Sequence, residues 1–123
     1  MSLLDVDSVF DFYTPVIIAN NTFLAEEPET ARAFLDAVSR GYEFAIEHPR
    51  EAGEILCKAA PELDPDLVKA SQEYLADKYQ ADAPQWGYID QERWDAYYAW
   101  LNEKGLTETP IEAGTGCSNE YLP

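Results

Sequence analysis

Apolar residues recur three and four positions apart over several stretches of the chain, which is the spacing of an amphipathic helix. The longest such stretch runs from about Pro28 to Glu47 and is apolar around most of its circumference. We therefore expect it to be a central helix that packs between two neighbours. The same spacing predicts a single turn beginning at Phe23 and further helices over about 49–60 and 65–79, with a last one ending near Lys104.

Residues with known preferences for helix ends mark where these helices begin and stop. Asp64 stands before Pro65, which is the order of an N-cap followed by a proline in the first turn. Asp90 is placed as the N-cap of the last helix, and Gly105 is placed to end it with a left-handed residue. Four or so well-bounded helices follow from these signals.

One segment has the pattern of a strand. Pro15 favours an extended backbone in the residue before it, and Val16, Ile17 and Ile18 form a continuous apolar run typical of a strand buried on both faces. A lone strand leaves its backbone N–H and C=O groups without partners. We therefore expect that the chain is a piece of a larger protein, and that two copies form a homodimer through this strand region.

The pattern as a whole predicts a mainly α chain with one or two short β-strands. Three parts are expected along it. Residues 1–20 hold the strand and begin with Met1-Ser2-Leu3, which resembles a cloning remnant; residues 21–105 are helical; residues 106–123 form an irregular tail.

Charge narrows the choice of partners. The chain holds 24 Asp and Glu against 8 Lys and Arg, which gives a net charge of −16 at neutral pH. Such a surface repels phosphate backbones and anionic lipid, so we expect no nucleic-acid partner and no binding to a membrane surface. The charge serves solubility in one interpretation and attracts a cationic ligand in the other. No signal peptide and no apolar run long enough for a membrane span is present in the sequence.

The residues that carry most catalytic and metal chemistry are few. The one histidine, His48, precedes a proline at a helix end, and Cys57 and Cys117 have the spacing of neither a disulfide framework nor a zinc site. The Gly114-Thr115-Gly116 segment is not preceded by a strand, as a phosphate-binding loop would be. We therefore expect no catalytic residues, no metal and no cofactor, and predict that the chain is not an enzyme.

Aromatic residues are the more informative signal. Trp86 and Tyr88 lie in an expected loop, and Trp100 lies off the apolar stripe of the last helix, so these rings either pack or stack on a planar ligand. Asp11 and Tyr13 stand just before the expected strand, where binding sites of α/β proteins tend to lie. Asp11, Tyr13 and Trp86 are accordingly the candidate ligand-binding residues.

Several segments together resemble the C-terminal part of NMT1/THI5-like proteins, which belong with the SsuA/THI5-like substrate-binding proteins of ABC transporters. The resemblance covers nearly the whole chain after Leu4. The matching segments are DFYTPVIIAN over 11–20, GYEFAIEHPREA over 41–52, AAPEL over 59–63, WGYID over 86–90 with Trp94, and SNEYL over 118–122.

This resemblance implies part of one lobe of a type II periplasmic-binding-protein fold, with residues 1–20 in the region between lobes. It implies an extracytoplasmic protein, periplasmic or held as a lipoprotein. Such a protein captures a small planar ligand, a hydroxymethylpyrimidine or formylaminopyrimidine precursor of thiamine, and delivers it to the permease of an ABC importer. Tyr13 and Trp86 would then lie at or near the ligand cleft.

Two other functions stay open at this point. One is a THI5-like pyrimidine synthase of thiamine biosynthesis, which would need the histidine and cysteine-rich motif of the fungal branch and iron. The other is a freestanding helical interaction domain whose acidic ridge is the partner surface.

Overall fold

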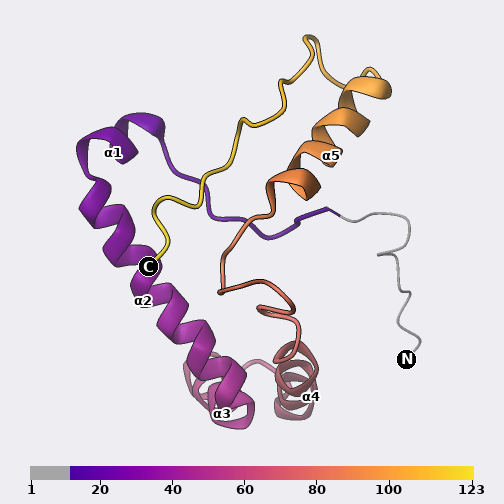
Figure 1. The fold of residues 1–123 in the computed structure, drawn as a ribbon. Helices are drawn as coiled ribbons and strands as arrows, with labels where there is room; N and C mark the ends of the chain where they lie inside the picture. Colours follow the sequence, from indigo (N-terminus) through magenta and orange to yellow (C-terminus); the bar gives the residue numbers. More distant parts are fainter. Residues whose placement is uncertain (1–11) are drawn as a thin grey trace. The chain divides into compact units, whose positions relative to one another are not determined.

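The computed structural model describes residues 12–123, and within this range the chain folds into helices joined by irregular segments (Figure 1). The helices are α1 (Asn21–Glu26), α2 (Pro28–Glu47), α3 (Pro49–Ala59), α4 (Pro65–Leu75) and α5 (Gln91–Glu103). Two compact units divide the chain. The three-helix unit comprises Ala25–Tyr88 and Tyr121–Pro123, and the α5 unit comprises Ile89–Glu120 with the described residues up to Leu24.

Close packing in the three-helix unit depends on small residues. Helix α3 packs along α4, and α2 packs against α3 (Figure 1). Gly53 of α3 is buried, and a Cβ atom there would stand 3.5 Å from Val68 Cγ1 of α4, which is ordinary van der Waals contact. Ala31, Ser39, Val68 and Ala76 are the other buried residues of this unit. The end of the chain returns to α2, where the Arg32 guanidinium lies 5.3 Å from the centre of the Tyr121 ring.

The predicted start of α4 is confirmed, but its predicted end is wrong. Asp64 accepts hydrogen bonds from the backbone N–H groups of Asp66 at 2.9 Å and Leu67 at 3.2 Å, as an N-cap does. The helix ends at Leu75 and does not reach Tyr79. Beyond Leu75 the chain tightens into a turn, because the Lys78 N–H bonds to the Leu75 carbonyl only three residues back.

Both predicted ends of α5 are confirmed. Asp90 Oδ1 accepts a hydrogen bond of 2.9 Å from the Arg93 N–H, which caps the first turn. At the other end Gly105 has a φ of +63°, its N–H bonds to the Asn102 carbonyl, and the Leu106 N–H bonds to the Leu101 carbonyl. This pair of bonds is a Schellman motif, in which glycine takes the left-handed position at no steric cost.

Side-chain amides tie the irregular segments of the α5 unit together. Asn119 Oδ1 accepts from the Ile89 N–H at 2.9 Å, and Asn119 Nδ2 donates to the Ile89 carbonyl at 2.8 Å. Asn102 makes the same paired contact with the backbone of Ile111, at 2.9 Å for each bond. These bonds satisfy peptide groups that no helix or sheet satisfies.

The predicted strand is absent from residues 12–123, which contain no β-strand. Val16, Ile17 and Ile18 lie in an irregular segment and are 42%, 53% and 86% exposed. Their β-branched side chains favour a strand, but a strand also needs a neighbouring backbone to pair with, and the described chain supplies none. The mainly helical character is therefore confirmed, whereas a strand at these residues was predicted wrongly.

The expectation that the longest helix packs between two neighbours is wrong within the described residues, and apolar side chains of α4 are exposed as well. Phe34 of α2 is 56% exposed, and Leu67 and Tyr74 of α4 are 62% and 54% exposed. Helix α2 therefore is not enclosed by neighbours on both sides within the described chain. Helices α2, α3 and α4 each carry more apolar side chains than their contacts with one another can cover, so some of these side chains face outward. Of the helices in residues 12–123, none combines the length and apolar character needed to cross a lipid bilayer.

Candidate functional site

Tyr13, the first candidate ligand-binding residue, is fixed against the start of α5. Its hydroxyl accepts a hydrogen bond of 2.9 Å from the Asp90 N–H. Its ring lies 4.2 Å from the guanidinium carbon of Arg93, in the arrangement of a cation–π contact, and 6.4 Å from the Trp94 ring. The side chain is therefore anchored at both its polar and its apolar parts. Asp11, the second candidate, lies outside the described residues.

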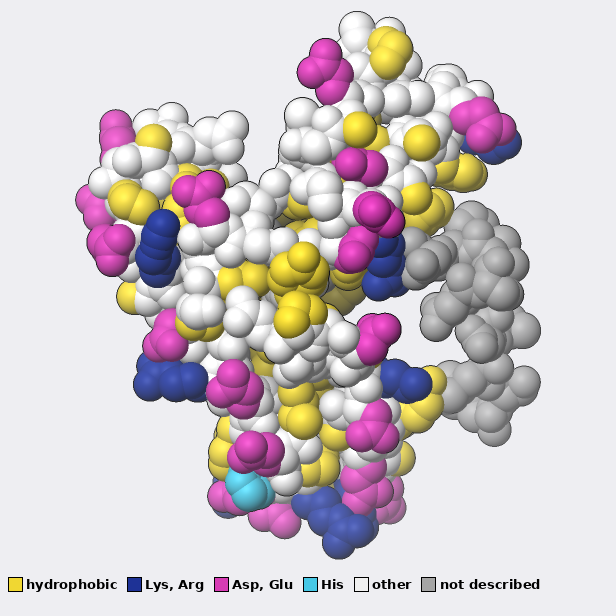
Figure 2. Space-filling view, viewed as in Figure 1, with side chains coloured by type: hydrophobic (Ala, Val, Ile, Leu, Met, Phe, Trp, Pro, Cys, Tyr) yellow, Lys and Arg dark blue, Asp and Glu magenta, His cyan; other side chains and the backbone are white. Residues whose placement is uncertain are grey.

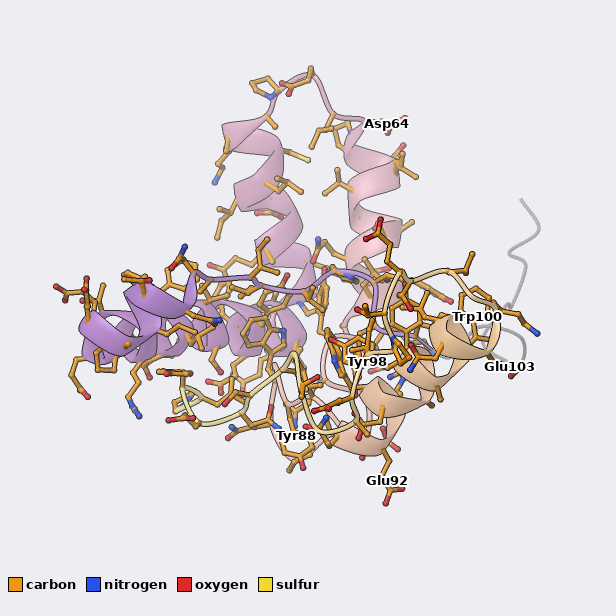
Figure 3. All side chains as sticks on the ribbon, turned by 90° about the horizontal axis from the view of Figure 1, so that it is seen from above. Asp64, Tyr88, Glu92, Tyr98, Trp100 and Glu103 are labelled. Atoms are coloured by element: carbon orange, nitrogen blue, oxygen red, sulfur yellow. The ribbon has the colours of Figure 1, made fainter. Side chains whose placement is uncertain are left out.

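An aromatic cluster extends along α5 from this point. The rings of Phe12 and Tyr97 have centroids 4.6 Å apart, and Tyr97 stacks on Trp100 at 6.3 Å with an interplanar angle of 15°. Tyr98 meets Trp94 edge to face at 5.8 Å. Figure 3 shows Tyr98 and Trp100 on α5, and Glu92 pointing away from the first turn of the helix. Trp100 therefore packs against its neighbours, which was one of the two roles predicted for it; the other was stacking on a planar ligand.

The tail turn over 114–117 closes on this cluster. Gly116 has a φ of +82°, and a Cβ atom there would collide with the Tyr98 hydroxyl and lie 3.2 Å from Trp94 Nε1. That indole nitrogen is buried and has no hydrogen-bond partner in the structure. The Gly114 N–H donates to Asp95 Oδ1 at 2.9 Å. The turn consequently lies directly on the rings of Tyr98 and Trp94.

Cys117 ends this turn as a free thiol of intermediate exposure. Burial raises the pKa of the Cys117 thiol above its ordinary value, and the nearby Asp95 carboxylate raises it further, against a lowering hydrogen bond from the thiol to Gln91. A thiol with a raised pKa is a poor nucleophile at neutral pH.

Trp86, the third candidate, lies in the three-helix unit and stacks on Tyr42 of α2. The two ring centroids are 4.3 Å apart and the planes differ by 18°. Tyr79 also contacts Tyr42, edge to face with ring centroids 5.1 Å apart, and its hydroxyl donates to Gln72 Oε1 at 3.2 Å. Trp86 is thus half-buried against a tyrosine and is not a free ring in a loop.

Next to these rings is an open hollow of about 380 Å³ between α2, α3 and α4. Its lining is mostly apolar, with one amide from α4. The lining residues are Val38, Gly41, Tyr42, Ala45, Ala52, Gln72 and Tyr79. We call this space the α2–α4 hollow.

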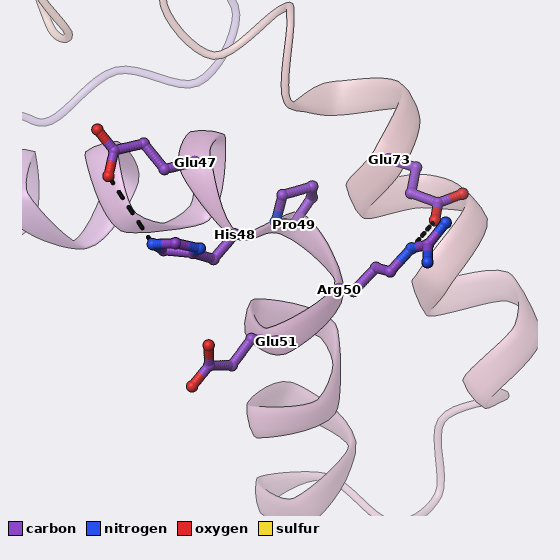
Figure 4. Close-up of a pocket in the computed structure, with 6 residues that line it drawn as sticks. All are labelled: Glu47, His48, Pro49, Arg50, Glu51 and Glu73. Carbon is purple, nitrogen blue, oxygen red and sulfur yellow. Dashed lines mark hydrogen bonds and ion pairs between the residues drawn. The ribbon is translucent and has the colours of Figure 1, made fainter.

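A second hollow, of about 510 Å³, lies where α2 meets α3 and is lined by charged groups (Figure 4). Arg50 Nε lies 2.8 Å from Glu73 Oε1 and joins α3 to α4, and His48 Nε2 lies 3.9 Å from Glu47 Oε2. Within residues 12–123 no three His, Cys, Asp or Glu side chains are arranged to hold a metal ion. The charged side chains of this second hollow pair with one another at the surface, which favours a structural role for the α2–α3 junction.

Acidic side chains do not gather in one patch on the visible face. Figure 2 shows them spread over both parts of the chain, with Lys and Arg between them. This distribution agrees better with the solubility interpretation of the charge than with one cation-attracting surface.

Sequence reasoning selected Trp86 but missed the side chains around it. Tyr13 and Trp86 belong to different units, and their ligand-binding roles stay predictions. Tyr42 and Gln72 are not among the candidate residues that the sequence predicts. A tyrosine on an apolar stripe carries a polar hydroxyl that must reach a partner or solvent, and that was the one signal available for Tyr42 and Tyr79.

Comparison with known proteins finds similarity to one described family and to curated proteins of three names. Residues 1–52 match the family described as NMT1/THI5 like. A formylaminopyrimidine-binding protein of Halalkalibacterium halodurans is 29% identical over 102 residues, which are 80% of this chain and 31% of the relative. Riboflavin-binding protein RibY of Chloroflexus aurantiacus is 23% identical over 133 residues, spanning 100% of this chain and 37% of the relative.

A third relative corrects one prediction. The 4-amino-5-hydroxymethyl-2-methylpyrimidine phosphate synthase of Candida albicans is 38% identical over 116 residues, which are 90% of this chain and 31% of the relative. This relative is named as an enzyme, which contradicts the prediction that the chain is not an enzyme. A scarcity of histidine and cysteine in a stretch that spans 31% of that relative does not decide whether a protein is an enzyme.

The chain spans about a third of the length of these curated relatives. Two of them are named as binding proteins and one as a synthase, and all three align with most or all of the present sequence. Together with the match of residues 1–52 to the family described as NMT1/THI5 like, they confirm the resemblance to NMT1/THI5-like proteins that was predicted from the sequence.

Proposed function

We propose that this chain takes part in recognising an aminopyrimidine. The observation that carries the proposal is that two relatives are named for such rings, a formylaminopyrimidine in one and a 4-amino-5-hydroxymethyl-2-methylpyrimidine phosphate in the other. Riboflavin, in the name of the third, also contains a pyrimidine ring within its fused flat system. Flat nitrogen heterocycles are the chemistry that these names share.

The side chains of the chain suit such a ligand. Aromatic rings stack on flat heterocycles, and pockets for them are mostly apolar with a few polar groups that fix orientation. The Tyr42–Trp86 stack and the α2–α4 hollow supply these components in one unit. The rings of the α5 unit, in contrast, are already packed against one another and against Gly116.

The wider role that we propose is capture of the ligand outside the cytoplasm and its delivery to the permease of an ABC importer. The names of the two binding-protein relatives support a capture role. The acidic, water-compatible surface suits a protein that diffuses between ligand and permease.

A second candidate is a part in synthesis of the pyrimidine. The 38% identity to the synthase over 90% of this chain supports it. Both candidates need the same ring to be bound, as ligand in one and as product in the other, so recognition of the ring is their common requirement.

We also propose a homodimer that forms through Val16, Ile17 and Ile18. Three neighbouring apolar side chains that are about half exposed or more, on backbone outside any helix, favour pairing with another chain. Light scattering at several concentrations tests this: the unaltered chain should sediment or scatter as a dimer, and Ile17→Lys should be a monomer. A monodisperse monomer for the unaltered chain would rule the dimer out.

Calorimetry tests the main proposal. The chain is titrated with formylaminopyrimidine, with 4-amino-5-hydroxymethyl-2-methylpyrimidine and with thiamine, and saturable heat is expected for the two free pyrimidines. Mass spectrometry of the purified protein and of reaction mixtures then separates the two candidates, because only a synthase generates the pyrimidine when none is added. Absence of heat with both pyrimidines would overturn the proposal.

A further inference from the structure

We propose that Tyr121, Leu122 and Pro123 form a strap, a short peptide ligand that the chain supplies to its own three-helix unit. The docking surface for this strap consists of the first half of α2 and the turn at Gly87. The partner that fits this surface is a peptide in which leucine follows an aromatic residue. The inference goes beyond the proposed function, because it concerns a peptide-binding surface and does not depend on any pyrimidine.

The first residue of the strap covers a cation on α2. The Arg32 guanidinium lies 5.3 Å from the centre of the Tyr121 ring, and Arg32 Nε lies 4.0 Å from Glu29 Oε1. Tyr121 is half-buried although only two residues follow it in the sequence. The last residues of a chain are usually poorly ordered unless contacts hold them. A ring face on a guanidinium is such a contact, and the cation–π attraction strengthens it.

The second residue of the strap lies against the turn at Gly87. A Cβ atom at Gly87 would stand 3.1 Å from Leu122 Cδ2, and Gly87 has a φ of +84°. Glycine therefore serves two purposes here, because it takes the left-handed conformation without strain and leaves room for the leucine. Trp86, the preceding residue, stacks on Tyr42 of α2 with ring centroids 4.3 Å apart. Leu122 thus holds the segment that places Trp86 on α2.

The strap lies on a part of α2 that its neighbouring helices leave uncovered. Figure 1 shows α3 and α4 at the C-terminal end of α2, and the end of the chain lying on α2 itself. Ala31, in the first half of α2, is nonetheless only 6% exposed. Tyr121 contacts the next residue along the helix, Arg32. The strap therefore takes the place of a packed helix over this half of α2.

The size of these contacts makes the strap exchangeable. One cation–π contact and one leucine contact give weak binding between separate molecules. The covalent link raises the effective concentration of the strap at its surface, so docking within one chain is favoured over docking between chains. A free peptide of the same sequence should therefore bind only when the chain's own strap is altered.

The first test alters the strap in the full-length chain. Tyr121→Ala combined with Leu122→Ala removes both contacts, and we call this protein the strap variant. Hydrogen exchange at the amides of Arg32 and Tyr88 should become about tenfold faster, because the segments that carry them open more easily. Exchange at Val68 on α4 should change little. Tyr121→Phe keeps a ring over Arg32 and should behave like the unaltered chain.

Tyr74→Ala is the matched control within the same unit. Tyr74 is 54% exposed, and its ring lies 5.9 Å from Lys78 Nζ, so this substitution also removes a tyrosine and a cation–π contact. That contact joins residues four positions apart and bridges no distant segments. Exchange at Arg32 and Tyr88 should therefore stay unchanged. Equal acceleration by Tyr74→Ala and by the strap variant would overturn the strap.

The second test supplies the strap from outside. The peptide Ser-Asn-Glu-Tyr-Leu-Pro, which repeats residues 118–123, is added to the strap variant and to the unaltered chain. In the strap variant it should restore slow exchange at Arg32 and Tyr88 and shift the amide NMR signals of Arg32 and Gly87. The unaltered chain should not respond, and the peptide Ser-Asn-Glu-Ala-Ala-Pro should act on neither protein.

A double-mutant cycle keeps the leucine contact testable even if the strap variant does not fold. Gly87→Ala introduces left-handed strain in any background, but it meets Leu122 only where the leucine is present. The acceleration of exchange at Tyr88 caused by Gly87→Ala should therefore be smaller in a Leu122→Ala background. The same acceleration in both backgrounds would overturn the contact. Peptide-induced shifts confined to α4 or to the α5 unit would overturn the docking surface.

Discussion

The two units of the chain are stabilised by different kinds of contact. The three-helix unit packs its helices through small residues, of which Gly53 against Val68 is the closest example. The α5 unit has one long helix, and its irregular segments are fixed by stacked rings and by the amides of Asn102 and Asn119. Helix packing through small residues requires only that no bulky side chain separates the helices. Fixing an irregular segment by rings and amides requires particular side chains at fixed positions.

This difference predicts different sensitivity to single substitutions. A helix interface can absorb a methyl group where the neighbours are at ordinary contact distance. A side chain that satisfies two peptide groups has no substitute, because each unpaired buried group costs about 1–3 kcal/mol. Matched substitutions in the two units test this difference, and hydrogen exchange lets one unit report independently of the other.

The largest effect is expected from Gly116→Ala, and Gly53→Ala is the matched substitution in the other unit. Gly116→Ala places a Cβ atom on the Tyr98 hydroxyl and requires a φ of +82° from a residue with a side chain. Overpacking and left-handed strain together should destabilise the α5 unit by about 2–5 kcal/mol. Gly53→Ala meets Val68 and Gln72 at 3.5 and 3.7 Å, so the three-helix unit should change by less than about 1 kcal/mol.

Hydrogen exchange at Ile111 and Val68 measures the two effects in separate units. Equal protection loss in both units after Gly116→Ala would show that they do not respond as separate bodies. An unchanged α5 unit would show that the Tyr98 ring moves aside without cost.

Asn119→Ala should have the next largest effect. It removes both hydrogen bonds to the Ile89 backbone, of 2.9 and 2.8 Å, and leaves a part-buried N–H and C=O without those partners. We expect about 1–3 kcal/mol of lost stability in the α5 unit, with faster exchange of the Ile89 amide. Ser118→Ala is the neighbouring control, since Ser118 bonds only within its own turn at Glu120 and is exposed.

Asp64→Ala tests the three-helix unit with a smaller change. The substitution removes the cap that accepts from the Asp66 and Leu67 N–H groups and should cost about 1 kcal/mol. Asp64→Asn keeps an oxygen acceptor and should retain most of that stability. Thermal denaturation ranks the three proteins, and a loss as large with asparagine as with alanine would show that the negative charge is the important property.

The smallest effect concerns the Cys117 thiol. Because burial raises the pKa of Cys117, less thiolate is present at any pH below that value, and alkylation in the folded chain should be slower than after unfolding in denaturant. The midpoint of the pH–rate profile should move upward on folding. A Cys57→Ser background isolates the Cys117 signal, and a profile that is the same in both states would contradict the raised pKa.

Local chemistry explains which features the sequence predicted correctly. Asp64, Asp90 and Gly105 act within four residues of themselves, and each helix end they mark is found in the structure. The strand at Val16–Ile18 was predicted from propensity alone, but a strand is completed only by a partner, which the sequence of the segment does not specify. The α2–α4 hollow was missed for a similar reason, because Tyr42, Gln72 and Tyr79 meet only when three helices have packed.

Among the described residues no large side chain is fully buried, and the buried apolar set consists of Ala31, Val68 and Ala76. This scarcity of buried apolar side chains determines the heat-capacity change on unfolding, because that change grows with the apolar surface that unfolding exposes to water. The described units should therefore unfold with a small increment and have a shallow dependence of stability on temperature. Any partner or ligand that covers Phe34 or Leu67 would instead bind with a distinctly negative change in heat capacity.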